Sequence, residues 1–373
     1  MALTVTDVAS RRDRRAFVDL PYRLYPPDSN WAPPGMRSDQ HHFLKRKNPF
    51  FEESAGAFLL ARRGDEVVGR IAVFEAVAFN RHHDRRWALF HWLEAKDDPA
   101  ITAALVEAAA AWGRARRLER LVGPMGPLPV EPVGLLVEGF DEPPMIGVPY
   151  HHPYYEGHLL AAGLEPMADF LSGRIPVDPS RAPEQFPELA DAAAEAHGYE
   201  TRNFSSRREL LRWVPRIVDS MTEAHSGLWE YRPMETKQAI RLLRRAMLIA
   251  DPRVVLVLMQ GERLVGHVLM LPDVADTLQA SRGRLFPLWW WRFIRAARTT
   301  DRLRMTSIGL APDHRGTGAN LVLYARMMRR ASAYRFTEAT LGQVNAENRK
   351  IIRNMEAVGV PWKVRHRVYG MGV

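Results

Sequence analysis

Two stretches of alternating apolar and charged character recur along the chain with the same internal design. Residues 58–76 read FLLARRGDEVVGRIAVFEA, and residues 254–273 read VVLVLMQGERLVGHVLMLPD. Each places an apolar run, a charged turn led by glycine and a second apolar run, which predicts two strands joined as a hairpin. Gly64 and Gly69 precede Gly261 and Gly266 by the same interval. The repeated pattern indicates an internal duplication.

The ends of the two copies also correspond. YYEGHLLAAGLEPM stands ahead of the strand-like DFLSGRI, and KIIRNMEAVGVPW stands ahead of KVRHRVYG. Gly163 and Gly359 are separated by nearly the same interval as the glycines of the hairpins. We therefore expect two tandem units, residues 1–175 and 181–373, joined at the Pro-rich stretch IPVDPSRAP.

Within each copy the pattern predicts a helical beginning, the hairpin, a further strand, a helix, a strand, a helix and a last strand. This order indicates an α/β protein with an α+β mixed sheet in each unit. In the first copy, Asp98 is placed to cap a helix whose first position is Pro99. In the second copy, the strand RLRMTSIGL leads through APDHRGTG into the helix ANLVLYARMMRRA.

The copies differ by two insertions, which we expect to form loops or lids. The first copy is longer around GPMGPLPVEPVGLLVEGFDEPP, and the second copy is longer at TLQASRGRLFPLWWWRFIRAARTT. At helical spacing, five apolar residues of the second insertion share one face, and four arginines lie opposite or beside it. The apolar residues are Leu285, Leu288, Trp289, Phe293 and Ala296, and the arginines are Arg292, Arg295, Arg298 and Arg302.

Composition narrows the class of protein. Of 373 residues, 46% are hydrophobic and 25% are charged, which is typical of a globular protein. The net charge of +9 favours an anionic partner such as a cofactor phosphate, an acidic carrier protein, tRNA or a lipid surface, although solubility alone would explain it. The absence of Cys excludes disulfides and thiolate chemistry. No stretch reads as a signal peptide or membrane span, so a cytoplasmic location is expected.

The loop RGTGAN carries the clearest chemistry. Gly316 and Gly318 permit backbone conformations in which successive N–H groups converge on one point, and such a nest binds an anion. The helix that starts near Asn320 adds its positive end, and Arg315 can complete the site. A nucleotide P-loop would require Lys followed by Ser or Thr, which this loop lacks. The alternative is a turn that only caps the helix.

This loop resembles motif A of the GCN5-related N-acetyltransferase (GNAT) superfamily. Arg315, Gly316, Thr317, Gly318 and Ala319 fit that motif, whereas Asn320 stands at its final small position. The stretch NAENRKIIRNMEAVGV resembles motif B, in which Asn348 and Gly359 match. Met355 stands where the superfamily usually has the tyrosine that protonates the departing thiolate. The chain also resembles a group of bacterial tandem proteins of this superfamily, through the segments NPFF, GRIAVFE, GLLVEGFDEPP, PYYEGHLLAAGLEP, WEYRPM and VLMLPD.

The resemblance implies two tandem GNAT-like domains, of which the first is a degenerate copy without the loop. It implies an N-acyltransferase that moves an acyl group from acetyl-CoA or another acyl-CoA, or from acyl carrier protein phosphopantetheine, to a small-molecule amine. Residues 306–310 would hold the pantetheine arm. The cofactor-binding residues that it implies are Ile308, Leu310, Arg315, Gly316, Thr317, Gly318, Ala319, Asn320 and Asn348.

A general base is predicted only by residue type. His267, Glu230 and Tyr369 are the candidates, and for each of them a purely local structural role is the alternative. The pairs of adjacent histidines at His41 and His82 do not favour a metal site, because neighbouring side chains on a strand point to opposite faces.

Three further interpretations stay open. An aminoacyl-tRNA-dependent transferase would also use tandem domains and would suit the positive charge. A noncatalytic CoA- or acyl-binding module would suit Met355 and Asn320. The amphipathic insertion is a lid over an acyl chain, a contact with an acidic carrier or a membrane interface, or a helix packed on its own domain.

Overall fold

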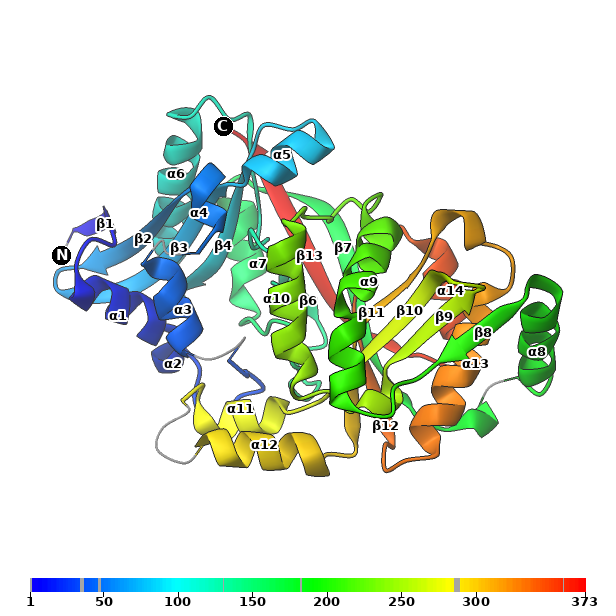
Figure 1. The fold of residues 1–373 in the computed structure, drawn as a ribbon. Coiled ribbons are helices and arrows are strands. Elements are labelled where there is room, and N and C mark those ends of the chain that lie inside the picture. The colour runs from blue at the N-terminus through cyan, green and yellow to red at the C-terminus, as the bar shows by residue number, and fades with distance from the viewer. Residues whose placement is uncertain are drawn as a thin grey trace.

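The computed structural model describes residues 2–33, 37–45, 48–129, 131–181, 183–284, 289–357 and 359–373. Strands from both copies join in one mixed sheet (Figure 1). The strand order is β1-β2-β3-β4-β5-β13-β7-β12-β11-β10-β9-β8, and β6 pairs with β13 beside this path. The α/β fold class expected from the sequence is confirmed.

The first copy contributes the following elements: β1 (Leu3–Asp7), α1 (Arg11–Asp19), α2 (Pro21–Leu24), α3 (Arg37–Leu44), α4 (Phe50–Glu53), β2 (Ala55–Arg63), β3 (Glu66–Glu75), α5 (Val77–His83), β4 (Trp87–Ala95), α6 (Pro99–Arg114), β5 (Arg120–Gly123), β6 (Leu135–Glu138), α7 (Tyr154–Ala161) and β7 (Glu165–Pro176).

After the turn η1 (Pro179–Arg181), the second copy contributes α8 (Phe186–His197), β8 (Tyr199–Arg202), α9 (Arg207–His225), α10 (Thr236–Met247), η2 (Pro252–Val254), β9 (Leu256–Gln260), β10 (Arg263–Pro272), α11 (Ala275–Ser281), α12 (Trp289–Thr299), β11 (Arg302–Leu310), η3 (Pro312–His314), α13 (Ala319–Ser332), β12 (Glu338–Asn345), α14 (Arg349–Glu356) and β13 (Trp362–Gly372).

The last strand of each copy lies against the other copy. β13 pairs with β5, with Tyr369 opposite Gly123, and β7 pairs with β12, with Leu341 opposite Gly173. β7 and β13 pair with each other in antiparallel fashion. The strands of the two copies therefore follow the same order when the sheet is followed inward from either edge, except that each copy's last strand, β7 or β13, stands in the place of the other's. Division of the chain at residues 175–181 stays a prediction, but each copy's strands are completed by a strand from the other.

The two predicted hairpins are present as β2–β3 and β9–β10. Gly69 and Gly266 have the same role in them, because each lies where a helix packs closely on the sheet. A Cβ at Gly69 would stand 2.7 Å from Ile101 of α6, and a Cβ at Gly266 would stand 3.1 Å from Leu323 of α13. The matching glycines thus reflect the same helix-on-sheet packing in both copies.

Helices cover both faces of the sheet. In the first copy, α6 and α7 pack over one core cluster and α1, α3 and α4 over another. In the second copy, α8, α13 and α14 cover one face and α9 and α10 the other. Figure 1 shows α9 and α10 in front of the second copy's strands. Asp98 caps α6 as predicted, since its side chain accepts a hydrogen bond from the Ala100 N–H.

The second insertion packs against the segment that follows the first. Ile146 of that segment packs with Leu278 of α11 and with Phe293 and Ala297 of α12. Phe293 and Ala296 face inward, as the helical spacing predicts. Leu285 and Leu288 and the side chain of Trp289 lie outside the described residues. Among the described residues, every helix is too short or too polar to cross a lipid bilayer.

Candidate active site

Strands β11 and β12 run side by side only at their beginnings. Their parallel pairing starts at Arg302 with Glu338 and ends at Met305 with Leu341. Beyond that point, residues 307–310 pair with β10, whereas β12 continues along β7 as far as Asn345. The two strands separate at the stretch for which the resemblance implies the pantetheine arm, and Ile308 and Leu310 lie on it.

The loop after β11 presents a row of free backbone donors. Gly316 has φ +89° and Gly318 has φ +85°, so both adopt the left-handed conformation that favours glycine. None of the five consecutive N–H groups of residues 316–320 donates a hydrogen bond to a described residue. Two of these N–H groups belong to Ala319 and Asn320, the first residues of α13, and the N-terminal end of this helix carries partial positive charge. The arrangement is that of an anion-binding nest.

Two cations flank this nest. A guanidinium N–H of Arg315 donates to the carbonyl oxygen of Ala224 at 2.8 Å, which fixes Arg315 at the end of α9. The Nζ of Lys350 lies 3.9 Å from the point where a Cβ on Gly316 would stand. Asn348 caps α14, because its side chain accepts a hydrogen bond from the Ile351 N–H at 3.4 Å. Asn348 thereby orients the helix that carries Lys350, a residue that the sequence did not single out.

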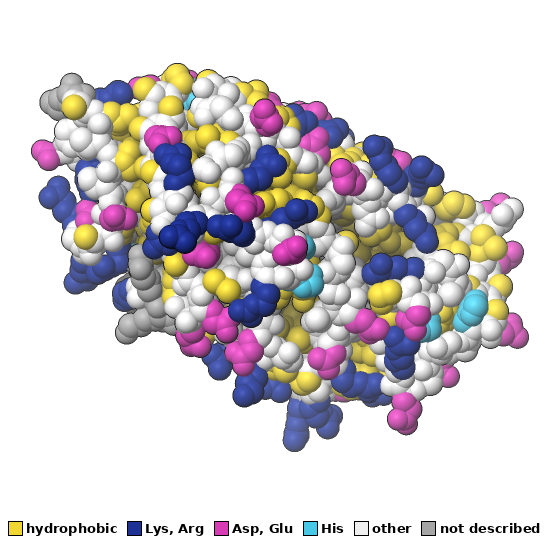
Figure 2. Space-filling model, turned by 90° about the horizontal axis from the view of Figure 1, so that it is seen from above, with side chains coloured by type: hydrophobic (Ala, Val, Ile, Leu, Met, Phe, Trp, Pro, Cys, Tyr) yellow, Lys and Arg dark blue, Asp and Glu magenta, His cyan; other side chains and the backbone are white. Residues whose placement is uncertain are grey.

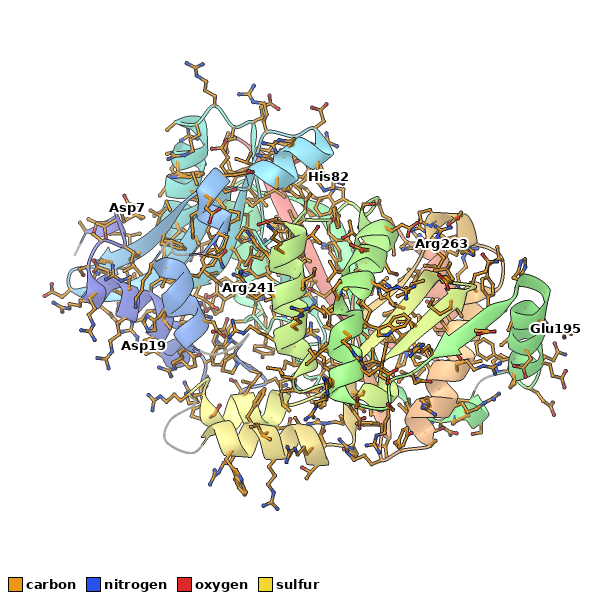
Figure 3. All side chains as sticks on the ribbon, viewed as in Figure 1. Asp7, Asp19, His82, Glu195, Arg241 and Arg263 are labelled. Atoms are coloured by element: carbon orange, nitrogen blue, oxygen red, sulfur yellow. The ribbon has the colours of Figure 1, made fainter. Side chains whose placement is uncertain are left out.

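Surrounding contacts hold the loop rigid. The Thr317 hydroxyl donates to the His314 carbonyl at 2.8 Å, and the Tyr199 hydroxyl lies 2.8 Å from the Thr317 hydroxyl. Arg263 bonds to Asp313 at 2.6 Å and to Glu223 of α9 at 2.8 Å. Figure 3 shows Arg263 at this end of the second copy, beside α9. These contacts fix the loop before any ligand arrives, which lowers the entropic cost of binding.

Replacing Lys350 by Met is expected to weaken the binding of CoA by about tenfold, because one ammonium group beside a phosphate contributes on the order of 1 kcal/mol near a protein surface. The affinity of the variant should depend less on salt than that of the wild type. Calorimetric titration of CoA at two ionic strengths measures both effects. Lys363→Met is the control, because Lys363 pairs with Glu142 away from the loop. An equal loss in both variants would contradict the assignment.

The segment between α9 and α10 carries Glu230 and lies against the first copy. The first copy holds this segment by several contacts. The Nε2 atom of His82 lies 2.7 Å from the Ser226 carbonyl oxygen, and that of His83 lies 2.6 Å from the Tyr231 carbonyl oxygen. The Trp229 ring lies 6.1 Å from the Trp87 ring, and Arg232 donates to the carbonyl oxygens of Gly126 and Glu131 at 2.7 and 2.9 Å. The first copy therefore positions Glu230.

Glu230 is a largely buried carboxyl group with a raised pKa. Its Oε2 atom is buried without a hydrogen-bond partner among the described residues. Burial raises the pKa of Glu230, while a hydrogen bond from Asn345 and the charges of Arg232 and His225 oppose that rise. Asn345 ends β12, one of the two strands that separate. A carboxylate with a raised pKa beside the strand opening is suited to accept a proton.

His267 lies deeper in the protein. Its two ring nitrogens lie 2.9 Å from the hydroxyls of Ser220 and Ser307, and it is fully buried. Burial lowers the pKa of His267 well below its usual range, and the charge of His225 lowers it further. The ring is thus kept neutral with both nitrogens occupied, which favours a role in holding Ser307 on β11.

His225 ties α9 to the opened strand. Its Nδ1 lies 2.7 Å from the Met221 carbonyl oxygen and its Nε2 lies 3.1 Å from the Ile308 carbonyl oxygen. Both ring nitrogens of His225 are thus engaged with backbone carbonyl groups, one on α9 and one on β11. The rings of His225 and His267 pack 5.7 Å apart at Gly309.

Replacing Gly309 by Ala is expected to destabilise the protein by about 1–3 kcal/mol, because the added methyl group has no room. A Cβ there would stand 2.6 Å from the Ala224 Cβ and 2.8 Å from the His267 ring. Urea denaturation measures the loss. Gly157→Ala is the matched control, because Gly157 lies within α7 and its Cβ would meet nothing within 4 Å, so the substitution should stabilise slightly. Equal effects at both sites would refute this packing.

Two residues singled out from the sequence lie elsewhere. Tyr369 is buried in the core of the first copy, where its hydroxyl donates to Glu156 at 2.6 Å. Burial and that contact raise the pKa of Tyr369. Met355 is buried in the core of the second copy, where it lines a small apolar cavity with Tyr324 and Met305. The structure does not bring Tyr369 together with the nest, and Met355 has a packing role.

The first copy has acidic and buried polar groups at the matching positions. The N-terminal end of α6 carries Asp97 and Asp98 in place of a glycine nest. Burial raises the pKa of Glu94, on β4, to about 7, and its Oε2 accepts hydrogen bonds from Tyr25 at 2.8 Å and Tyr155 at 3.1 Å. Negative charge at this helix end disfavours a phosphate group. The anion nest is therefore specific to the second copy.

Comparison with solved structures identifies the fold. The structure aligns with the tandem GNAT protein from the clavulanic acid biosynthesis pathway over 100% of this chain and 98% of that chain, with a TM-score of 0.55 and 12% sequence identity. The chain has the tandem GNAT fold. The resemblance inferred from the two motifs is thus confirmed at the level of the fold.

Two curated proteins are similar in sequence to this tandem GNAT-fold chain. The bacterial ceramide synthase of Caulobacter vibrioides (strain NA1000 / CB15N) is 28% identical over 297 residues, which cover 78% of this chain and 76% of that protein. Protein YghO of Escherichia coli (strain K12) is 24% identical over 306 residues, which cover 80% of this chain and 77% of that protein. No protein-family model matches the chain.

Proposed function

We propose that the second copy is an N-acyltransferase site that takes an acyl group from a thioester of the CoA type and gives it to an amine. The observation that carries the proposal is the row of five unused N–H groups at residues 316–320. A pyrophosphate group fits these donors together with Arg315 and Lys350. The first copy, with Asp97 and Asp98 at the matching position, is a degenerate unit that holds the segment bearing Glu230.

In this proposal, residues 306–310 hold the pantetheine arm and offer an N–H group to the thioester carbonyl. Glu230 takes a proton from the amine as the amine nitrogen attacks the carbonyl carbon, so that a C–N bond forms and the C–S bond breaks. Met355 cannot donate a proton to the departing thiolate. The proton gained by Glu230 is then returned to the sulfur, which balances the reaction.

The similarity to a bacterial ceramide synthase favours a particular kind of acceptor. Ceramides are amides of long-chain amino alcohols, so we propose an amine carried on a long apolar chain. The same similarity favours a long-chain acyl donor over acetyl-CoA. The acyl chain length and the amine are separable in an assay, because each is varied while the other is held fixed.

Release of free thiol from acetyl-CoA and from a long-chain acyl-CoA, with a panel of amines that includes a long-chain amino alcohol, tests the proposal. We expect thiol release that depends on the amine and yields the matching amide by mass spectrometry. Binding of CoA without thiol release for any amine would favour the noncatalytic module. Transfer only from charged tRNA, with binding that weakens steeply with salt, would favour the tRNA-dependent alternative.

A further inference from the structure

The outer face of α12 presents apolar and basic side chains together. Trp291 is 52% exposed and Ile294 is 38% exposed, and they lie one helical turn apart. Arg295 and Arg298 continue the same face at the next turn, and the Arg295 guanidinium lies 5.5 Å from the Trp291 ring centre. We propose that this outer face, residues Trp291, Ile294, Arg295 and Arg298, binds the surface of an anionic lipid membrane.

The inner face of α12 is already occupied. Phe293, Ala296 and Ala297 pack with Val274 and Leu278 of α11. The helix is also anchored through α11 to the first copy, where Arg37 donates from Nε to the Arg282 carbonyl oxygen at 3.0 Å. The outer face therefore belongs to a helix held in place on its other side. Its exposed Trp and Ile find no cover within the described part of the chain.

Exposed large hydrophobic side chains gather at this corner. Of the five in the described residues, Trp291 and Ile294 lie on α12, and Leu248, 58% exposed, lies next to Ile249, which packs with the inner face of α12. Figure 1 shows the end of α10, which Leu248 follows, close to α11 and α12. Tryptophan and aliphatic side chains beside arginines are typical of a helix that lies in the plane of a membrane interface.

The charge at this corner suits an anionic surface. α12 carries Arg292, Arg295 and Arg298 and no acidic residue, and the exposed Arg244 and Arg245 end α10. On the face seen in Figure 2, by contrast, Lys and Arg side chains are interspersed with Asp and Glu. Each basic residue near an anionic bilayer adds about 1 kcal/mol of attraction. An acidic protein would match the same charge, and binding to vesicles separates the two kinds of partner.

The membrane face is connected directly to the candidate active site. Two residues after α12 the chain enters β11, whose far end is the opened stretch of residues 306–310. A surface at one end of this strand would bring the protein to an amine or acyl chain dissolved in a bilayer. The inference does not require the proposed acyl transfer, because membrane binding is measured without substrate.

Co-sedimentation of the full chain with vesicles tests the inference. We expect binding to vesicles rich in phosphatidylglycerol and little binding to pure phosphatidylcholine vesicles. The double substitution Trp291→Ser with Ile294→Ser should weaken binding by about tenfold or more. The double substitution Arg295→Glu with Arg298→Glu should abolish the preference for anionic vesicles.

Matched controls exist elsewhere on the molecule. Leu160→Ser with Leu189→Ser removes two side chains that are 46% and 53% exposed on α7 and α8. Arg11→Glu with Arg12→Glu makes the same charge change on α1. Both controls should bind vesicles as the wild type does. The inference would be overturned if the wild type did not bind anionic vesicles, or if it bound an acidic protein but no vesicles. It would also be overturned if the controls lost as much binding as the α12 variants.

Discussion

Replacing Glu230 by Gln is expected to lower the rate of amine-dependent thiol release by about 10²- to 10⁴-fold, the range that a positioned general base contributes. Gln keeps the shape of the side chain and the contact with Asn345 but cannot accept a proton. The KM for the acyl donor should change little, because the nest lies on the loop after β11 and does not include Glu230.

The pH dependence of the reaction gives a second readout. Since burial raises the pKa of Glu230 above its ordinary value of 4.5, the base is fully ionised only at higher pH. The rate of the wild type should rise with pH through that raised pKa. The residual activity of Glu230→Gln should lack this acidic limb. A full pH–rate profile of both proteins measures the difference.

Stability should change in the opposite direction to activity. A carboxyl group whose pKa is raised on folding contributes stability that is present below its unfolded pKa and is lost as pH rises through the folded pKa. At a pH above its raised pKa, the ionised, buried Glu230 is therefore unfavourable, and Gln should raise the melting temperature. Gain of stability with loss of activity distinguishes a base from a structural residue.

Glu131→Gln is the matched control for this experiment. Burial also raises the pKa of Glu131, to about 7, but its carboxylate accepts a hydrogen bond from the Leu128 N–H of the first copy. This variant should keep most of the activity. If Glu230→Gln retains the wild-type rate and pH profile, Glu230 is not the base.

Replacing Gly316 by Asp is expected to weaken the binding of CoA by about a hundredfold, which corresponds to about 2.7 kcal/mol. Space is not the reason, because only the Lys350 Nζ lies within 4 Å of a Cβ at this position. The carboxylate would repel a phosphate group and compete for the free N–H groups. Calorimetric titration with CoA measures the affinity.

Gly316→Asn separates charge from backbone strain. Asn and Asp are the side-chain-bearing residues that most readily adopt positive φ, and the two have nearly the same shape. The Asn variant should bind CoA within about tenfold of the wild type. If the Asn and Asp variants bind CoA equally well, the nest does not hold the anionic part of the cofactor.

Local features of the fold were predictable because their causes are local. Gly64 and Gly261 mark the hairpin turns, and both have positive φ. Asp98 and Pro99 mark the start of α6 by the ordinary rules for helix starts. The loop of residues 315–320 was recognisable because a glycine nest is formed by a few consecutive residues.

Features formed by distant residues were not predictable from the same patterns. Nothing in the apolar pattern of β13 indicates that it pairs with β5 and β7, because any buried strand has such a pattern. The sequence does not distinguish Lys350 from the other basic residues, because only the folded position of α14 brings it close to Gly316. Glu230 gains its raised pKa from burial in the folded protein. His267 and Glu230 were equal candidates by residue type, and only their partners separate them.

The most direct test of the account is a crystal structure of the protein with bound CoA. We expect the pyrophosphate to accept hydrogen bonds from the N–H groups of residues 316–320 beside Arg315 and Lys350, with the pantetheine arm along residues 306–310. Well-ordered CoA bound at another surface, with these N–H groups still free, would contradict the account.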